Sequence, residues 1–201
     1  LLPRDLYGPR RRNSMGVDLS NEQRLALLAK NLEASVDAAW KALPSGAQSE
    51  GTLTPVRNPA DHRDIVGYVR GATREEIAAA LAAAAAAAPR WAATPPQERA
   101  AILCRAADAL EARTDVLVGL MAREAGKSFP NAVAEVREAA DFLRYYSAEI
   151  VRTFGDKAPA PLGPVVCISP WNFPLAIFTG QITAALAAGN PVLAKPASPT
   201  P

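Results

Sequence analysis

Asn172 lies in a rigid aromatic turn toward the C-terminal end of the sequence. The turn, Pro170–Pro174, flanks Asn172 with a tryptophan and a phenylalanine and follows the apolar run Pro164–Ile168. A side-chain amide on a rigid loop can donate a hydrogen bond to a developing oxyanion. Asparagine in a proline-rich segment is also a common turn residue, so both interpretations stay open on the residues alone.

Lys195 ends a second apolar run, and an apolar segment of helical length, from about Leu175, separates the two runs. This order predicts a βαβ unit with parallel strands. Ligands of such sheets bind beyond the carboxyl ends of the strands, so we expect Ser169 to Asn172 to lie beside Lys195. The N-terminus of the helix between them suits an anionic or polyhydroxyl ligand. No G-x-G-x-x-G follows the first strand, so a dinucleotide would be held in another way.

A helix and a hairpin are predicted upstream of this unit. Ser20 has capping-box spacing to the glutamine three residues later, and apolar residues then follow one helical face through Val36 to Trp40. A turn of type Asn-Pro-Ala-Asp separates the extended runs Leu53–Arg57 and Ile65–Arg70, which predicts a β-hairpin.

Several helices are predicted between the hairpin and the βαβ unit. Thr73 opens a capping box, and we expect its helix to end at Ala88, before Pro89. Alanines 82–88 in this helix indicate tight packing against neighbours. Thr94 is the expected cap of the next helix. The remaining predicted elements are a helix to about Arg113, helices Asp115–Ala125 and Phe129–Phe154, and a C-terminal cap at Gly126.

The bulk composition is that of a globular protein. The chain has 201 residues, of which 49% are hydrophobic and 21% charged, and its net charge is +2. This charge is too small to indicate nucleic acid or an anionic membrane as a partner. No apolar run reaches the roughly 18 residues of a transmembrane segment.

Two cysteines, Cys104 and Cys167, are expected to be buried structural thiols. Neither belongs to a C-x-x-C pair, and with a single histidine the chain cannot assemble a zinc ligand set, so we expect no metal. Thiols without partners suit a reducing compartment, which favours a cytoplasmic location.

The turn Pro170–Pro174 and the downstream segment Gly189–Pro196 together resemble the aldehyde dehydrogenase superfamily in residues and spacing. The resemblance extends over about residues 52–197. Within it, Glu135–Tyr146 resembles the glutamate-γ-semialdehyde (pyrroline-5-carboxylate) dehydrogenases. The preceding Leu6–Gly16 resembles the segment that joins the two catalytic parts of bifunctional proline utilization A enzymes.

The resemblance implies three domain-level parts and an incomplete fold. Residues 1–17 would form a linker, residues 18–51 a helix and a loop, and residues 52–201 the N-terminal portion of an aldehyde dehydrogenase NAD-binding domain. Because the sequence begins with Leu1 and ends abruptly at Pro201, we expect it to be a piece of a longer chain. The fold class is then α/β, with helices, a β-hairpin and the first βαβ of a parallel sheet.

The resemblance also implies the reaction. A cysteine thiolate attacks the aldehyde, an asparagine side chain and a backbone N–H hold the oxyanion, NAD⁺ accepts hydride, and water hydrolyses the thioester. The substrate would be L-glutamate γ-semialdehyde, oxidised to L-glutamate in proline catabolism. FAD would belong only to a proline dehydrogenase part, which is absent here.

The resemblance assigns roles to individual residues. Asn172 would be the catalytic oxyanion donor, and Lys195 would bind the adenosine ribose. Glu138 would lie near the substrate ammonium, although it also fits a solvated helix carboxylate. The remaining residues of the cofactor cleft would be Ile168, Ser169, Pro170 and Trp171.

Two departures from the family pattern stand out. Ser198 occupies the position where the family usually has a ribose-binding glutamate, which leaves the choice between NAD and NADP open. The nucleophilic cysteine and the catalytic glutamate of the family would both follow Pro201, and neither Cys104 nor Cys167 matches the nucleophile's motif. We therefore expect the chain alone to be inactive and poorly stable, and the full-length protein to be a homo-oligomer acting on a small aldehyde.

Two alternatives remain. The chain could belong to another aldehyde dehydrogenase with a different substrate. It could also be an inactive helical remnant or interaction module, which its alanine-rich helices favour slightly.

Overall fold

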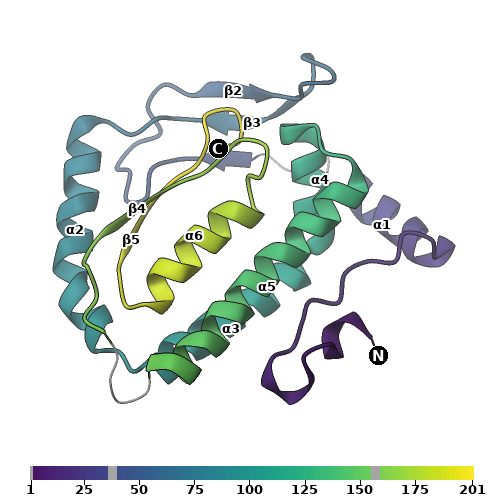
Figure 1. Cartoon of the computed structure of the whole chain (residues 1–201). Coiled ribbons are helices and arrows are strands. Elements are labelled where there is room, and N and C mark those ends of the chain that lie inside the picture. Colours follow the sequence, from purple (N-terminus) through teal and green to yellow (C-terminus); the bar gives the residue numbers. More distant parts are fainter. Residues whose placement is uncertain (1, 36–39, 155–158) are drawn as a thin grey trace.

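Helices and two small sheets make up the computed structural model, which describes residues 2–35, 40–154 and 159–201 (Figure 1). Two short 3₁₀ turns, Pro3–Asp5 and Gly8–Arg10, precede the regular elements. The described helices are α1 (Glu22–Ser35), α2 (Arg74–Ala93), α3 (Pro96–Ala112), α4 (Thr114–Ala125), α5 (Phe129–Phe154) and α6 (Ala176–Ala187). The described strands are β1 (Trp40–Ala42), β2 (Thr54–Arg57), β3 (Ile65–Val69), β4 (Val165–Ile168) and β5 (Val192–Lys195).

The first sheet contains the predicted hairpin and one unpredicted strand. Strands β2 and β3 pair antiparallel, which confirms the hairpin, and β1 pairs parallel with β3 on its other edge. Trp40, expected at the end of the first helix, instead opens β1 opposite Gly67. The backbone of Trp40 comes so close that a Cβ at Gly67 would lie 2.6 Å from the Trp40 carbonyl oxygen. At Trp40, pairing with a distant strand therefore overrides the helical spacing of the sequence. Val36, which was also expected in the first helix, lies outside the described residues.

Helix α1 begins two residues later than Ser20 because a different residue caps it. The Asn21 side-chain oxygen accepts a 2.9 Å hydrogen bond from the Arg24 N–H. The hydroxyl of Ser20 instead donates to Asp18. Asparagine and serine are equally good N-caps, so the sequence pattern alone does not choose between adjacent candidates.

Helix α2 departs from the prediction in length and in burial. The capping box between Thr73 and Glu76 is present, but the helix continues through Pro89 to Ala93. Residues 82–88 are exposed or half-buried, so the expected tight packing is wrong for the described part of the chain. Ile77 and Leu81 are also exposed, at 55% and 51%. A small side chain permits close packing, but burial also requires that another element of the fold lies against the helix.

Helices α3, α4 and α5 lie within a residue or two of their predicted bounds. Thr94 is not the cap of α3, because Pro95 occupies that position and the Thr94 hydroxyl donates to the Arg90 carbonyl. Gly126 ends α4 with φ 65°, the left-handed conformation expected of a C-terminal glycine.

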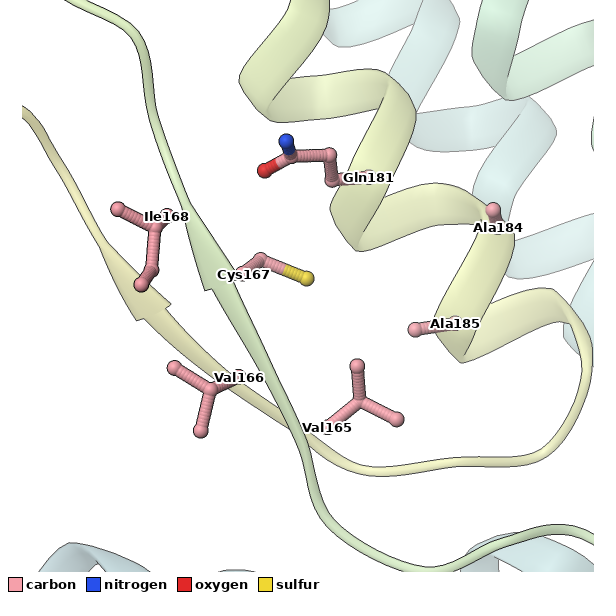
Figure 2. Close-up of a pocket in the computed structure, with 7 residues that line it drawn as sticks. All are labelled: Val165, Val166, Cys167, Ile168, Gln181, Ala184 and Ala185. Atoms are coloured by element: carbon pink, nitrogen blue, oxygen red, sulfur yellow. The ribbon is translucent and has the colours of Figure 1, made fainter.

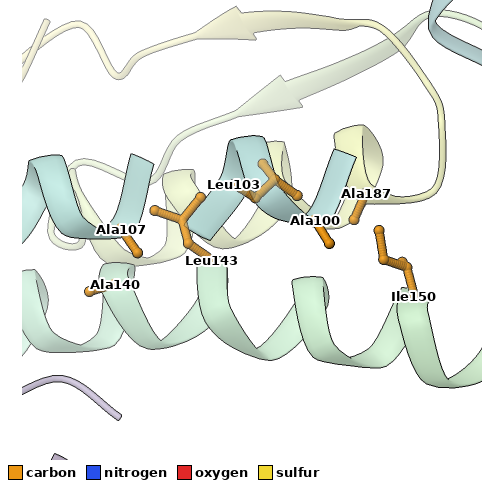
Figure 3. Close-up of a cluster of buried hydrophobic side chains, with 7 residues drawn as sticks. All are labelled: Ala100, Leu103, Ala107, Ala140, Leu143, Ile150 and Ala187. Atoms are coloured by element: carbon orange, nitrogen blue, oxygen red, sulfur yellow. The ribbon is translucent and has the colours of Figure 1, made fainter. Parts of the chain in front are cut away.

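The main apolar core joins α3, α5 and the end of α6 (Figure 3). Small and large side chains from α3 and α5 meet there at helical spacing. Its buried members are Ala100, Leu103, Ala107, Ala140, Leu143, Ile150 and Ala187. Cys104 on α3 is exposed, so its expected burial is wrong. Cys167 is buried in β4, as predicted.

Strands β4 and β5 are parallel, and α6 connects them, which confirms the predicted βαβ unit. The pair lies between α2 and α6 (Figure 1). Both ends of α6 are tied to neighbouring helices. At its C-terminal end, the Arg99 guanidinium and the Trp91 indole donate hydrogen bonds of 3.0 Å to the Ala187 and Leu186 carbonyls. At its N-terminal end, Glu135 accepts from the first amides.

The N-terminal segment is held against α5. Ser14 is fully buried, and its backbone N–H and hydroxyl donate to the two carboxylate oxygens of Asp141 at 2.7 and 2.9 Å. The Met15 N–H donates to Glu111 on α3. The Arg11 guanidinium stacks over the Tyr145 ring at 5.3 Å. This contact places the predicted linker directly over the helix that carries Glu138.

Within the described ranges, no single helix combines the length and the apolar character of a membrane span. Helices α2 and α3 reach that length and apolar character only as a pair, and the pair is bent by 115° at its junction.

Candidate active site

The predicted cofactor residues meet where β4 and β5 end. Ile168 is paired with Lys195 in the parallel register, and the Ser169 N–H donates a 3.0 Å hydrogen bond to the Lys195 carbonyl oxygen. The chain then leaves β4 into the Pro170–Pro174 turn. The structure thus brings together at one sheet edge the two segments that the βαβ pattern places there.

Most side chains at this edge face outward. Ile168 and Trp171 are 60% and 58% exposed, and Asn172 is also exposed. The exposed Lys195 ammonium donates to the Pro196 carbonyl at 2.9 Å, which leaves part of its donor capacity for a ligand. Ser169, by contrast, is buried and bonded to the Pro170 carbonyl, and Pro170 is half-buried. The edge therefore offers an ammonium, an amide and a large ring surface.

A buried carboxylate fixes the end of the turn. Glu135 on α5 is 2% exposed, and its Oε2 accepts hydrogen bonds from the Leu175 and Ala176 N–H groups at 3.0 and 3.1 Å. A carboxylate at this place also interacts favourably with the dipole of α6. These two amides are consequently engaged within the chain.

Lys127 completes this arrangement. Its ammonium forms an ion pair with Glu135 and lies 4.4 Å from the ring centroid of Phe173, the residue next to Asn172. The side chains of Lys127 and Glu135 are only 12% and 2% exposed. Gly126 precedes Lys127, and the left-handed turn at Gly126 directs the chain away from α4 toward this position.

The sequence alone assigns neither Lys127 nor Glu135 a role in the site. A signal for Glu135 exists, since it lies within the apolar stripe formed by Ala132, Val136 and Ala139 on α5. A carboxylate in a buried stripe requires charged or polar partners, because an unpaired buried charge is costly. Nothing in the sequence alone indicates that those partners come from α6 and from residue 127.

Glu138, the predicted substrate residue, lies one helical turn beyond Glu135 on α5 and is exposed. Residues three apart on a helix are neighbours on its surface. Glu138 is therefore a neighbour of Glu135 on α5, and its own side chain is in contact with solvent.

An open apolar cavity of about 570 Å³ runs along β4 beside α6 (Figure 2). The Val165 and Cys167 side chains point toward α6, whereas Val166 and Ile168 point away from it (Figure 2). Among the described residues that line the cavity, Cys167 and Gln181 carry its polar side-chain groups. Burial raises the pKa of the Cys167 thiol, the opposite of what a thiolate nucleophile requires.

A second titratable group lies away from this edge. Burial raises the pKa of Glu124 on α4 to about 7. Its carboxyl lines a smaller cavity of about 150 Å³ against the three-stranded sheet, together with residues that include Trp40, Tyr68 and Pro201.

The fold and the strand-end site define the class of protein. The family described as "Aldehyde dehydrogenase family" matches residues 46–201. The chain belongs to this family.

The chain is similar to the following three proteins. The chain is 60% identical over its whole length to "Bifunctional protein PutA" of Escherichia coli (strain K12) and spans 15% of that protein. It is 40% identical over 162 residues to "Alpha-ketoglutaric semialdehyde dehydrogenase" of Bacillus subtilis (strain 168), covering 75% of this chain and 33% of that protein. A solved 1-pyrroline-5-carboxylate dehydrogenase from Thermus with bound NAD superimposes with a TM-score of 0.86 at 30% identity.

The last comparison covers 94% of this chain and 40% of the Thermus chain. The described fold is therefore part of an aldehyde dehydrogenase fold, as the sequence pattern predicts.

Proposed function

We propose that the full-length protein carrying this chain oxidises L-glutamate γ-semialdehyde to L-glutamate with NAD⁺, as the second step of proline catabolism. The observation that carries the proposal is the pairing of Ile168 with Lys195, which sets the Asn172 turn and the exposed Lys195 side chain at the same sheet edge. Similarity to PutA over the whole chain supports the substrate and the bifunctional context.

The donors at the sheet edge fit a dinucleotide. The Lys195 ammonium is a suitable donor for ribose hydroxyls, and the exposed Trp171 and Ile168 side chains offer apolar surface beside it. Ser169 and Pro170 shape the floor through their backbone. When bound, NAD⁺ supplies the hydride acceptor.

Asn172 supplies the electrostatic part of the reaction. Attack by a thiolate on the aldehyde turns the carbonyl oxygen into an oxyanion, and the Asn172 amide donates a hydrogen bond to that oxygen. The two prolines of the turn restrict its backbone, so the donor is preorganised before the charge develops. Glu138 binds the substrate ammonium by charge-assisted hydrogen bonds.

The 201-residue chain alone is inactive in this proposal. Of its two thiols, Cys104 lies exposed on α3 and Cys167 is buried with a raised pKa. Neither meets the requirement for an activated nucleophile. Purified chain incubated with aldehyde and NAD⁺ should form no NADH, and measurable formation would contradict this part of the proposal.

The experiment for the whole proposal measures NADH formation by the full-length protein with L-glutamate γ-semialdehyde and with aliphatic aldehydes of similar length. A kcat/KM at least about 100-fold higher for the semialdehyde is expected, because a site built to pair an ammonium strongly rejects analogues that lack it. Equal values would show an aldehyde dehydrogenase of another specificity.

A semialdehyde without the ammonium is the second candidate substrate, favoured by the 40% identity to the Bacillus subtilis enzyme. The variant Glu138→Gln separates the two. It should lower kcat/KM for glutamate semialdehyde about 10- to 100-fold and leave the value for the 2-oxo analogue within about threefold. If the native protein prefers the 2-oxo analogue, the second candidate holds.

A further inference from the structure

We infer that Glu135, acting with Lys127, is a positioning residue that sets the location of the Asn172 amide. The inference rests on the proposed function for the identity of the reaction, but the contacts that carry it do not depend on that reaction. It assigns a role in the site to a buried pair that lies outside the strand ends.

The turn is anchored on both sides of Asn172. Before it, the Ser169 N–H is bonded to the Lys195 carbonyl at 3.0 Å. After it, the Leu175 and Ala176 N–H groups are bonded to one oxygen of Glu135 at 3.0 and 3.1 Å. Only five residues separate the two anchors, and two of them are prolines. The second anchor therefore largely determines where the Asn172 amide lies.

Lys127 links the same carboxylate to the turn itself. Its ammonium pairs with the other Glu135 oxygen and lies 4.4 Å from the Phe173 ring centroid. A desolvated cation at this distance from an aromatic face is attracted to it. Phe173 is bonded directly to Asn172 along the chain, so any shift of the Lys127–Glu135 pair is passed to the residue next to the donor.

Stability alone accounts poorly for a buried ion pair at this position. The desolvation cost of two buried charges largely offsets their attraction, and apolar residues of similar volume are often as stable. The surrounding stripe of α5 is apolar, with Ala132, Val136 and Ala139 buried beside Glu135. A carboxylate supplies what an apolar side chain cannot, namely directional bonds that fix the start of α6 relative to α5.

The test uses the full-length protein with Glu135→Gln, Lys127→Met and the double variant. Glu149→Gln is the matched control, because Glu149 is another α5 carboxylate, ion-paired to Arg152 on the surface. Four quantities are measured: kcat, KM for the aldehyde, the dissociation constant of NAD⁺, and hydrogen exchange of peptides covering residues 170–177.

Glu135→Gln should lower kcat about 10- to 100-fold, because a misplaced catalytic group costs this much in rate. KM and NAD⁺ affinity should change less than about threefold, and the Leu175 and Ala176 amides should exchange faster. Lys127→Met should lower kcat by a smaller factor, and the double variant should be no slower than Glu135→Gln, since the two residues act through one contact. The control should match the unmodified protein in all four quantities.

A kcat within twofold of the unmodified protein would overturn the inference, as would a loss of kcat accompanied by an equal loss of NAD⁺ affinity. If Glu135→Gln fails to fold, Lys127→Met keeps the amide bonds of Glu135 and is judged by the same kcat criterion. If the unmodified protein oxidises no aldehyde, the proposed function fails, and exchange decides the positioning role separately. Unchanged exchange at residues 170–177 in Glu135→Gln would then overturn it.

Discussion

The Ser169 N–H donates a hydrogen bond to the Lys195 carbonyl oxygen, and this single bond ties the entrance of the Asn172 turn to the residue proposed to bind ribose. Both residues lie at the carboxyl ends of parallel strands, where α/β folds form their ligand sites. The proposed oxyanion donor and the proposed cofactor ligand therefore share one rigid support. The role of each residue can be tested by a side-chain substitution that leaves this backbone hydrogen bond in place.

Replacement of Lys195 by methionine should weaken the cofactor interaction while retaining the length of the side chain. Loss of charge-assisted hydrogen bonds should raise KM for NAD⁺ about 10- to 100-fold and change kcat less than about threefold. Steady-state kinetics of the full-length protein provide the measurement. Lys41→Met is the control, because Lys41 also lies in a strand and pairs on the surface with Glu50. An unchanged KM for NAD⁺ would remove Lys195 from the cofactor site.

Asn172→Ala should instead act on kcat. The loss of one oxyanion donor costs about 100- to 1,000-fold in rate, with little effect on cofactor affinity. The comparison variant is Asn131→Ala, since Asn131 is exposed in the first turn of α5. Pre-steady-state and steady-state rates in the full-length protein give the two values. If Asn172→Ala and Asn131→Ala behave alike, Asn172 is a turn residue and no more.

Local patterns in the sequence predicted most helices and the βαβ unit, because capping residues, glycine ends and apolar periodicity act over a few neighbouring residues. The sequence does not indicate the parallel strand β1, because β3, its partner among the described strands, lies more than twenty residues away. Trp40 also continues a helical spacing up to that point. The alanine run of α2 was misjudged for a related reason. The alanine composition indicates that a helix can pack closely against a neighbour. Whether the helix is buried depends on which other element the fold places beside it.

The candidate site also contains residues that local sequence signals indicate and residues that only the fold brings together. The location of Asn172 and Lys195 at the strand ends follows from the sequence, because each comes at or just after the end of an apolar strand, which is a local signal. Glu135 on α5 meets the Leu175 amide at the start of α6, 40 residues later, and Lys127 reaches it from the segment between α4 and α5. Only the fold brings these groups to the turn. A charged residue within a buried stripe is the general sequence signal for such contacts.

Gly67→Ala should destabilise the three-stranded sheet, because the added Cβ would lie 2.6 Å from the Trp40 carbonyl oxygen. The cost should be about 1–3 kcal/mol in the free energy of unfolding, typical of an overpacked site. Gly71→Ala is the control, since nothing lies within 4 Å of its added Cβ. Denaturant midpoints of the two variants give the comparison. Equal midpoints would mean that β1 does not approach β3 this closely in solution.

Glu124 should make the stability of the chain depend on pH. Burial raises the pKa of this carboxyl from 4.5 to about 7 in the folded state, so folding favours the protonated form. Below pH 4.5 both states hold the proton and Glu124 contributes nothing. As pH rises from 4.5 to 7, the unfolded state releases its proton first, and the free energy of unfolding falls by on the order of 2–3 kcal/mol.

Glu124→Gln removes this dependence. The variant should match the native chain at pH 4 and should be more stable by on the order of 2–3 kcal/mol at pH 8, as measured by denaturant unfolding at both pH values. Glu149→Gln provides a contrast of opposite sign, because the hydrogen bond from Arg152 lowers the pKa of Glu149. That variant should lose stability relative to the native chain as pH rises. A Glu124→Gln difference that is the same at pH 4 and pH 8 would show that the carboxyl titrates with the same pKa in the folded and unfolded states, and hence that solvent reaches the cavity beside the three-stranded sheet.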